Sequence, residues 1–206
     1  MPKAVFSLPY FGSIHFFHEV VKHGTITIEK HENFQKQTYR NRQYIYGANG
    51  KLMLNLPVKH TKSSTRKKYL ECSLENEFKW QELHFKSLET AYRTSPYFEF
   101  YEDDIKPLFQ NTYEKVFDFN LACFQLAVEL LNLDIKISFT ENFKEEYTAP
   151  DEDFRYLINA KAKINNTFEP YHQVFENKHG FIPNLSILDL IFNLGPESIN
   201  YLKRLS

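Results

Sequence analysis

The chain has 206 residues, 42% hydrophobic and 25% charged, which is enough apolar material for a packed globular core. A formal net charge of −1 gives no global field to attract nucleic acid or an anionic membrane, and no stretch approaches the roughly 20 apolar residues of a membrane span. The sequence has no signal-peptide pattern, so we expect a cytoplasmic protein with reduced thiols, folded as one domain over residues 1–206. Cys72 and Cys123 have neither CxxC nor zinc-site spacing, so we expect no structural metal.

The chain opens with a strand, a helix and a second strand. Residues 4–12 form a short apolar run that Pro9 interrupts. Residues 13–24 have helical periodicity and finish at Gly24, and residues 25–31 alternate between apolar and polar side chains. This order predicts a βαβ-like opening in which the two strands pair in parallel.

A β-hairpin is predicted near residues 43–58. Asn49-Gly50 is typical of a type I′ turn, in which both central residues have positive φ. The residues after the turn place an apolar row on one face at period two: Leu52, Leu54, Leu56 and Val58. A basic loop follows, and residues 69–74 then have the composition of a further strand.

The remainder of the chain is mainly helical in pattern. Apolar spacing predicts helices over 77–95, 95–110 with a break near Pro107, and 116–133, then a pair within 183–205 separated by Gly195-Pro196. Residues 134–140 read as a strand and 145–154 as an acidic loop. We therefore predict a single α/β domain, or a mixed α+β one, with a small mixed sheet, the hairpin and a mainly helical C-terminal half.

Charge is distributed unevenly along the chain. Ten Lys or Arg stand against one acid, Glu32, between Lys30 and Lys68, whereas Glu99 to Asp153 holds fourteen acids against four Lys. The basic segment also carries a dense set of hydrogen-bonding side chains: Gln35, Gln37, Tyr39, Arg40, Asn41 and Arg42. Arg binds phosphate or carboxylate through paired hydrogen bonds, so these residues predict a site for a small anionic metabolite. The alternative is that the two Arg pair with the acidic half and Tyr39 packs.

Two histidines are candidates for acid–base chemistry. His60, with Lys62, follows the predicted hairpin, where a strand end feeds a loop. The alternative there is an exposed histidine in a basic loop. His84 lies on the apolar face of its predicted helix, where a hydrogen-bonded core histidine is the alternative to a catalyst.

The C-terminal segment holds further polar candidates. Ser186 and Asp189 fit the S-x-x-[DE] pattern that starts a helix. Asp189 and Asn193 are four residues apart on one face of an otherwise apolar helix, so each needs a partner, and Arg40 or Arg42 would suit Asp189. Tyr171 and Gln173 are two apart and would point to one side of an extended segment. No GxGxxG, GxxxxGK[ST], GxSxG or HExxH motif identifies a cofactor or a reaction, so the cofactor is unknown.

Four segments in the same order resemble the WbqC-like protein family: LPYFGSIHFF, HENFQKQTYRNRQYIYGANGKLMLNLPV, LHFKSLETAYRTSPYFEFY and PNLSILDLIFNLGP. The chain departs from the family pattern at residues 7–10, which lack the Gln with which many members begin. The resemblance implies a bacterial protein from loci for surface polysaccharides such as O-antigen, and it carries no catalytic residues with it.

From the residues and the resemblance together we expect a transferase that acts on an activated sugar, such as a nucleotide sugar, or a related anionic metabolite. The rival hypothesis is a non-catalytic binding or scaffold protein that uses the aromatic segment Tyr97 to Tyr101 as a partner surface. Nucleic-acid binding through residues 51–68 is disfavoured, because the basic stretch has few aromatic residues and the chain is nearly neutral. The sequence leaves the oligomeric state open.

Overall fold

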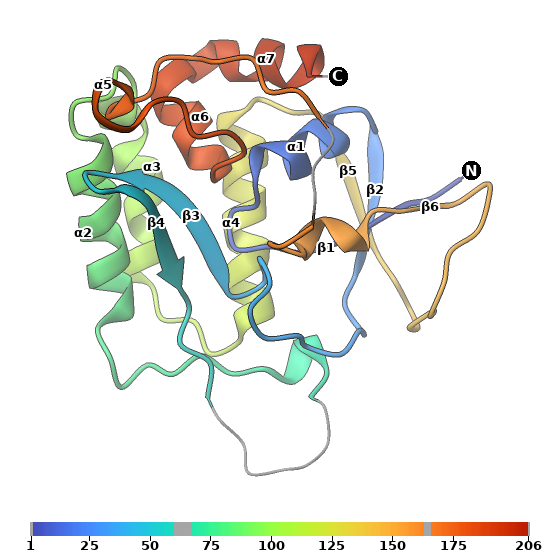
Figure 1. Cartoon of the computed structure of the whole chain (residues 1–206). Coiled ribbons are helices and arrows are strands. Elements are labelled where there is room, and N and C mark those ends of the chain that lie inside the picture. Colours follow the sequence, from blue (N-terminus) through green and yellow to red (C-terminus); the bar gives the residue numbers. More distant parts are fainter. Residues whose placement is uncertain (1, 60–66, 163–165, 206) are drawn as a thin grey trace.

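A parallel four-stranded sheet forms one side of the fold, on the right in Figure 1. The computed structural model describes residues 2–59, 67–162 and 166–205. The strands lie in the order β5-β2-β1-β6 and every pairing is parallel. Their bounds are β1 Ala4–Ser7, β2 Thr25–Glu29, β5 Lys136–Phe139 and β6 Glu152–Asp153. The predicted α/β class is confirmed, with a sheet that is parallel throughout its described strands.

The opening βαβ unit forms as the sequence predicts. β1 is buried along its whole length, and helix α1 (Ile14–Val21) returns the chain to β2 beside it. Ser13 caps α1 by accepting a hydrogen bond from the amide of Phe16. The C-terminal segment also closes this end of the helix, because Asn184 and Leu185 accept from the amides of His15 and Ile14.

The β-hairpin stands apart from the parallel sheet. β3 (Arg42–Gly47) pairs antiparallel with β4 (Gly50–Asn55), so residues 48–49 form the loop. Gly50 alone among the turn residues has positive φ, at 95°, and the predicted type I′ turn is therefore wrong. Of the predicted apolar row, Leu54 and Leu56 are buried, while Leu52 near the hairpin tip is 41% exposed.

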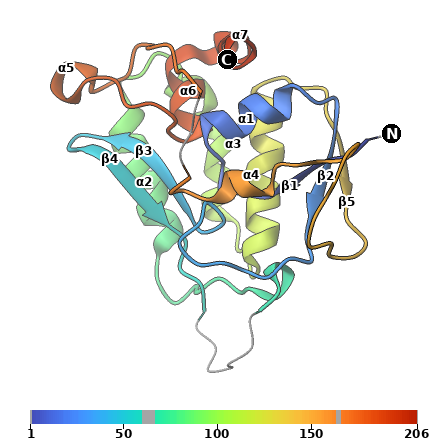
Figure 2. The same ribbon diagram turned by 45° about the vertical axis from the view of Figure 1, so that its right-hand side comes forward.

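The helices lie beside the hairpin, between the two β structures and at one end of the molecule. Figure 2 shows α4 between the hairpin and the sheet, and both views place α5, α6 and α7 together at one end. The bounds are α2 Trp80–Tyr92, α3 Phe98–Gln110, α4 Val116–Leu130, α5 Glu176–His179, α6 Ile187–Leu194 and α7 Ser198–Arg204. The predicted separation of α6 from α7 at Gly195-Pro196 is confirmed by a short 3₁₀ turn there. Within the described residues, no helix is long and apolar enough to cross a membrane.

Two local predictions are wrong. α3 runs through Pro107 to Gln110, because Pro107 is exposed and the buried Leu108 and Phe109 hold the last turn against the core. Residues 69–71 form a 3₁₀ turn instead of a strand. The buried Tyr69 fixes that turn, since its hydroxyl donates to the carbonyl oxygen of Leu8 over 2.8 Å.

Candidate functional site

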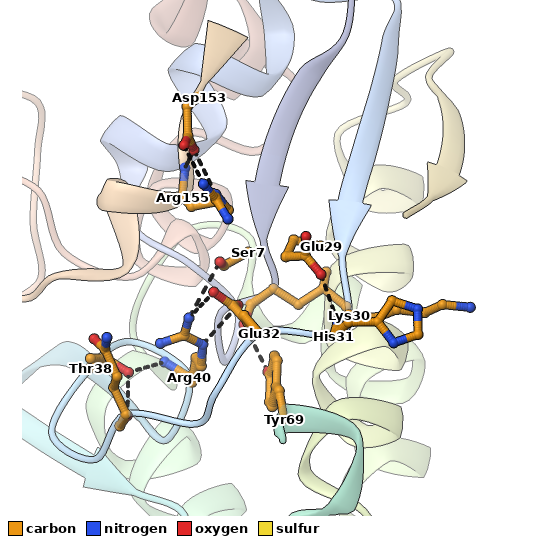
Figure 3. A network of polar contacts seen from close by, with 12 residues as sticks. Ser7, Glu29, Lys30, His31, Glu32, Thr38, Arg40, Tyr69, Asp153 and Arg155 are labelled. Carbon is orange, nitrogen blue, oxygen red and sulfur yellow. Dashed lines mark hydrogen bonds and ion pairs between the residues drawn. The ribbon is translucent and has the colours of Figure 1, made fainter. Parts of the chain in front are cut away.

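A polar cleft of about 660 Å³ opens at the carboxyl ends of the parallel strands (Figure 3). β2 lies on one side of β1 and β6 lies on the other, so the strand order reverses at β1. Ligands of open α/β sheets bind outside the strand ends at such a reversal of strand order. The cleft is lined by Glu32, Asn33, Gln35, Arg40, Phe143, Glu145, Asp153, Arg155, Tyr156, Ile158 and Asn159.

Arg40 is the central cation of this site. Its side chain is 2% exposed and forms an ion pair with Glu32, to which its Nε donates over 3.1 Å. Nη2 reaches the hydroxyl of Ser7 at the end of β1, at 3.5 Å, and the ring of Tyr69 lies 5.5 Å from the guanidinium carbon. Nη1 is buried and has no hydrogen-bond partner among the described residues. Native proteins pair almost all buried donors, so an unpartnered donor on a residue that lines the cleft marks Arg40 as a candidate ligand contact.

The segment that carries Arg40 is held in place by backbone contacts. The carbonyl oxygen of Glu32 accepts from the amide of Tyr69 over 2.8 Å, and the carbonyl oxygen of Arg40 accepts from Asn120 of α4 over 2.7 Å. The amide of Tyr39 donates to Ile158 over 2.8 Å. These contacts explain why a segment without regular structure can hold a guanidinium in a fixed position.

Arg155 forms the opposite wall of the cleft. Its Nε and Nη2 donate to Asp153, and its other hydrogen bonds reach the carbonyl oxygens of Lys144 and Glu145 at 2.8 and 2.9 Å. Burial works to raise the pKa of Asp153, but the hydrogen bonds from Arg155 outweigh it and the net pKa is lowered. The same bonds raise the pKa of Arg155. Arg155 therefore fastens the loop after β5 over the strand ends.

Glu29 is a second buried carboxylate at this edge. It ends β2, is fully buried, and its Oε1 accepts from the amide of His31 at 2.6 Å and the hydroxyl of Thr140 at 3.0 Å. Its Oε2 has no partner among the described residues. No motif in the sequence singles out Glu29 or Ser7 for the site. Their position as the last residues of parallel strands was the signal that could have identified them.

The structure divides the predicted binding residues between different places. Gln35 and Arg40 line the cleft, whereas a second hollow is lined by Gln37, Asn41 and Arg42 together with Lys36, Asn55, Leu56 and Val58. Tyr39 is buried, and burial raises its pKa to about 12. His60 and Lys62 lie outside the described residues.

His84 is a buried histidine of the core. Its Nδ1 lies 3.0 Å from the hydroxyl of Tyr10, and the ring of Trp80 meets it edge-on at 5.4 Å. Burial lowers the pKa of His84 to about 4, although a hydrogen bond with the backbone of Asn55 opposes the shift. The imidazole is therefore neutral at pH 7 and does not line the cleft.

The polar residues of the C-terminal segment gather around Asp189. Its carboxylate accepts hydrogen bonds from the hydroxyls of Tyr92 and Tyr171 and from Nε2 of Gln173. Asn193 donates to the Asp189 backbone carbonyl over 2.7 Å. Burial raises the pKa of Asp189 against the pull of these bonds. The expected partnership with Arg40 or Arg42 is wrong, because two tyrosines and a glutamine already occupy the carboxylate.

The N-terminus of α1 is not open to a phosphate. Helix N-termini bind anions through free amides, but the α1 amides donate to Ser13, Asn184 and Leu185. Among the residues that the structure describes, no group of three or more His, Cys, Asp or Glu side chains has an arrangement that could hold a metal ion.

The amino-acid sequence matches the profile of the WbqC-like protein family over residues 7–166 and again over 153–201. Searches of the curated proteins and of the solved structures each found no match. The two matched ranges include both walls of the cleft and the Asp189 cluster. The chain belongs to the WbqC-like protein family.

Proposed function

We propose that this protein is a cytoplasmic transferase of bacterial surface-polysaccharide biosynthesis, of the O-antigen type, or of a related small-molecule pathway. Its substrate is an activated sugar or a similar anionic metabolite, bound in the cleft at the carboxyl ends of the strands. The link of the WbqC-like family to O-antigen and polysaccharide gene clusters supports the pathway. The buried, unpartnered Nη1 of Arg40 is the observation that carries the site.

The chemistry of the cleft suits a hydroxyl-rich ligand. Carboxylates from Glu32, Glu145 and Asp153 stand beside the guanidiniums of Arg40 and Arg155, so hydrogen-bond acceptors and donors alternate around the space. Sugar hydroxyls use both kinds of partner. The two rings in the lining, Phe143 and Tyr156, are exposed and offer apolar faces to a sugar ring. Arg40 supplies the contact to the anionic part of the molecule.

The proposed transferase also needs a group for acid–base chemistry, for which the sequence offers His60 and His84. His84 is buried, neutral and outside the cleft, so we do not assign it a proton-transfer role. His60 stays a prediction, because it lies outside the described residues. Among the residues described, Glu32, Glu145 and Asp153 are the titratable acids within reach of a ligand in the cleft.

A ligand screen tests the proposal. We would follow thermal unfolding of the full chain with nucleotide sugars, sugar phosphates, acyl-CoAs and amino acids. Ligand at about 100 times its dissociation constant should stabilise the fold by about 2.7 kcal/mol. The test variant is Gln35→Ala, whose exposed side chain lines the cleft, and the matched control is Gln37→Ala, which lines the other hollow.

A nucleotide-sugar hit that Gln35→Ala weakens and Gln37→Ala retains would support the cleft as the substrate site. Equal responses of the two variants, or no nucleotide-sugar hit at all, would contradict it. Arg40 is unsuitable for this test, because its substitution would also leave Glu32 buried without its cation and so destabilise the fold.

The rival hypothesis of an aromatic partner surface receives less support. It required exposed rings in the segment Tyr97 to Tyr101 and no cleft containing Arg40. Phe98 is buried at 1% exposure, Tyr101 is half-buried, and Phe100 is exposed. Arg40 does line a cleft. A single exposed ring is normal on a monomeric surface.

A further inference from the structure

The second hollow, of about 260 Å³, lies where the two strands of the hairpin separate. It shares no lining residue with the cleft. Residues 33–42 contribute to both spaces, some side chains to the cleft and others to the hollow. The hollow is therefore a separate space with its own chemistry, and the proposed sugar site does not account for it.

Two of the residues that line this hollow each have a buried polar atom without a hydrogen-bond partner among the described residues. Asn41 is 7% exposed, and its Nδ2 donates to Asn55 over 3.0 Å, which fixes the orientation of the amide. Its Oδ1 has no partner among the described residues, and neither has the buried Nε of Arg42. Native proteins pair almost all buried polar atoms, so one acceptor and one donor left open beside a hollow indicate a missing ligand.

The charge of the hollow differs from that of the cleft. Its described lining contains the cations Lys36 and Arg42 and no acid, whereas the cleft has three carboxylates. A guanidinium with an open Nε–H matches one oxygen of a phosphate or carboxylate. The open carbonyl of Asn41 would repel that anion but accept from a hydroxyl next to it.

From this arrangement we propose that the hollow is a second binding site, for a small anion whose phosphate or carboxylate group stands next to a hydroxyl group. Arg42 binds the anionic oxygens and Asn41 accepts the hydroxyl hydrogen. Leu56 and Val58 provide the apolar part of the lining, against which the carbon skeleton packs. The site is independent of the sugar cleft, because no side chain that lines it also lines the cleft.

The experiment follows the two side chains, Arg42 and Asn41, by NMR. In nitrogen-15 NMR spectra of the full chain, we would follow the Nε–H signal of Arg42 and the side-chain amide of Asn41. The probes are inorganic phosphate, glycolate and acetate, each titrated at constant ionic strength against sodium chloride. Phosphate and glycolate test the two anionic groups, and acetate is glycolate without its hydroxyl. We expect a saturable shift of the Arg42 signal, with glycolate binding more tightly than acetate.

Matched variants complete the test. Arg42→Gln should weaken the binding of glycolate by about tenfold or more, which is the effect of losing one charge-assisted hydrogen bond. The control is Lys51→Gln, which removes a cation of the same hairpin that lies over Tyr44 at 4.3 Å, outside the hollow, and should keep the wild-type affinity. If Arg42→Gln fails to fold, Arg42→Lys keeps the charge without the Nε–H and should still bind more weakly.

An Arg42 signal that does not move, or that shifts without saturating for phosphate and for glycolate, would overturn the second site. So would an equal loss of binding in Arg42→Gln and Lys51→Gln. Equal affinity for glycolate and acetate would remove Asn41 from the proposal. Gln35→Ala should leave all three titrations unchanged, so failure of the sugar proposal and failure of this one are distinguishable.

Discussion

The buried histidine of α2 makes the stability of this protein depend on pH in a calculable way. Burial lowers the pKa of His84 from 6.5 to about 4, and the residue is 8% exposed, so little solvent screens it. Above pH 6.5 the imidazole is neutral in the folded and the unfolded chain. As the pH falls below 6.5, the unfolded chain binds a proton that the folded chain does not, and stability is lost down to the folded pKa.

The loss attributable to His84 amounts to about 3 kcal/mol between pH 7 and pH 4. That is a large fraction of the 5–15 kcal/mol typical of a folded domain. Carboxylates titrate over the same interval, so the wild-type curve alone cannot isolate one histidine. His84→Gln removes the titrating group and keeps a side chain that can accept from Tyr10.

The assay is urea unfolding of both proteins at several pH values between 7 and 4. Wild type should lose about 3 kcal/mol more than His84→Gln over this range. The control is Thr90→Ser, a substitution of an exposed, non-titrating residue of α2, whose pH curve should follow that of wild type. If the curves of wild type and His84→Gln run parallel, the imidazole is not held neutral by burial and the reasoning fails.

Two further substitutions test the packing around the site. Arg40→Met should lower the free energy of unfolding by about 3–5 kcal/mol, because it leaves Glu32 buried without its cation. Adding Glu32→Gln should recover much of this loss. Urea unfolding measures both variants, and no recovery in the double variant would contradict an ion-pair origin. Gly195→Ala should cost about 2–4 kcal/mol, because φ is +52° and the new Cβ would lie 2.6 Å from the ring of Tyr97. Gly24→Ala meets nothing within 4 Å and is the control; equal unfolding midpoints would refute the clash.

Elements with their own hydrophobic period could be predicted from the sequence. β2 alternates, α4 has a helical stripe, and both lie where the pattern places them. β6 could not be predicted, since its two residues are acidic and have no period. It exists because the amides of Glu152 and Phe154 donate to carbonyl oxygens of β1 and the residue before it, about 150 positions away in the chain.

The candidate site was only partly predictable for the same reason. Composition identified Arg40 and Gln35, because a run of hydrogen-bonding residues with few acids is visible in one segment. Ser7, which contacts Arg40, ends β1, and Arg155, on the opposite wall of the cleft, follows β6. The two come together at the cleft only once β1 and β6 are paired. A local pattern carries no information about which distant strand ends meet.

The position of Arg40 also changes how function has to be tested in this family member. Alanine at both Arg40 and Arg42 would be the obvious variant for removing the predicted anion site, but it would not isolate ligand binding. Arg40 combines a buried ion pair with an open Nη1, so its loss would weaken the fold and the site together. Arg42 lines the hollow and not the cleft, so one measurement on the double variant could not separate the effects of the two sites. Exposed lining residues such as Gln35 separate these effects, because their side chains can contact a ligand without supporting the core.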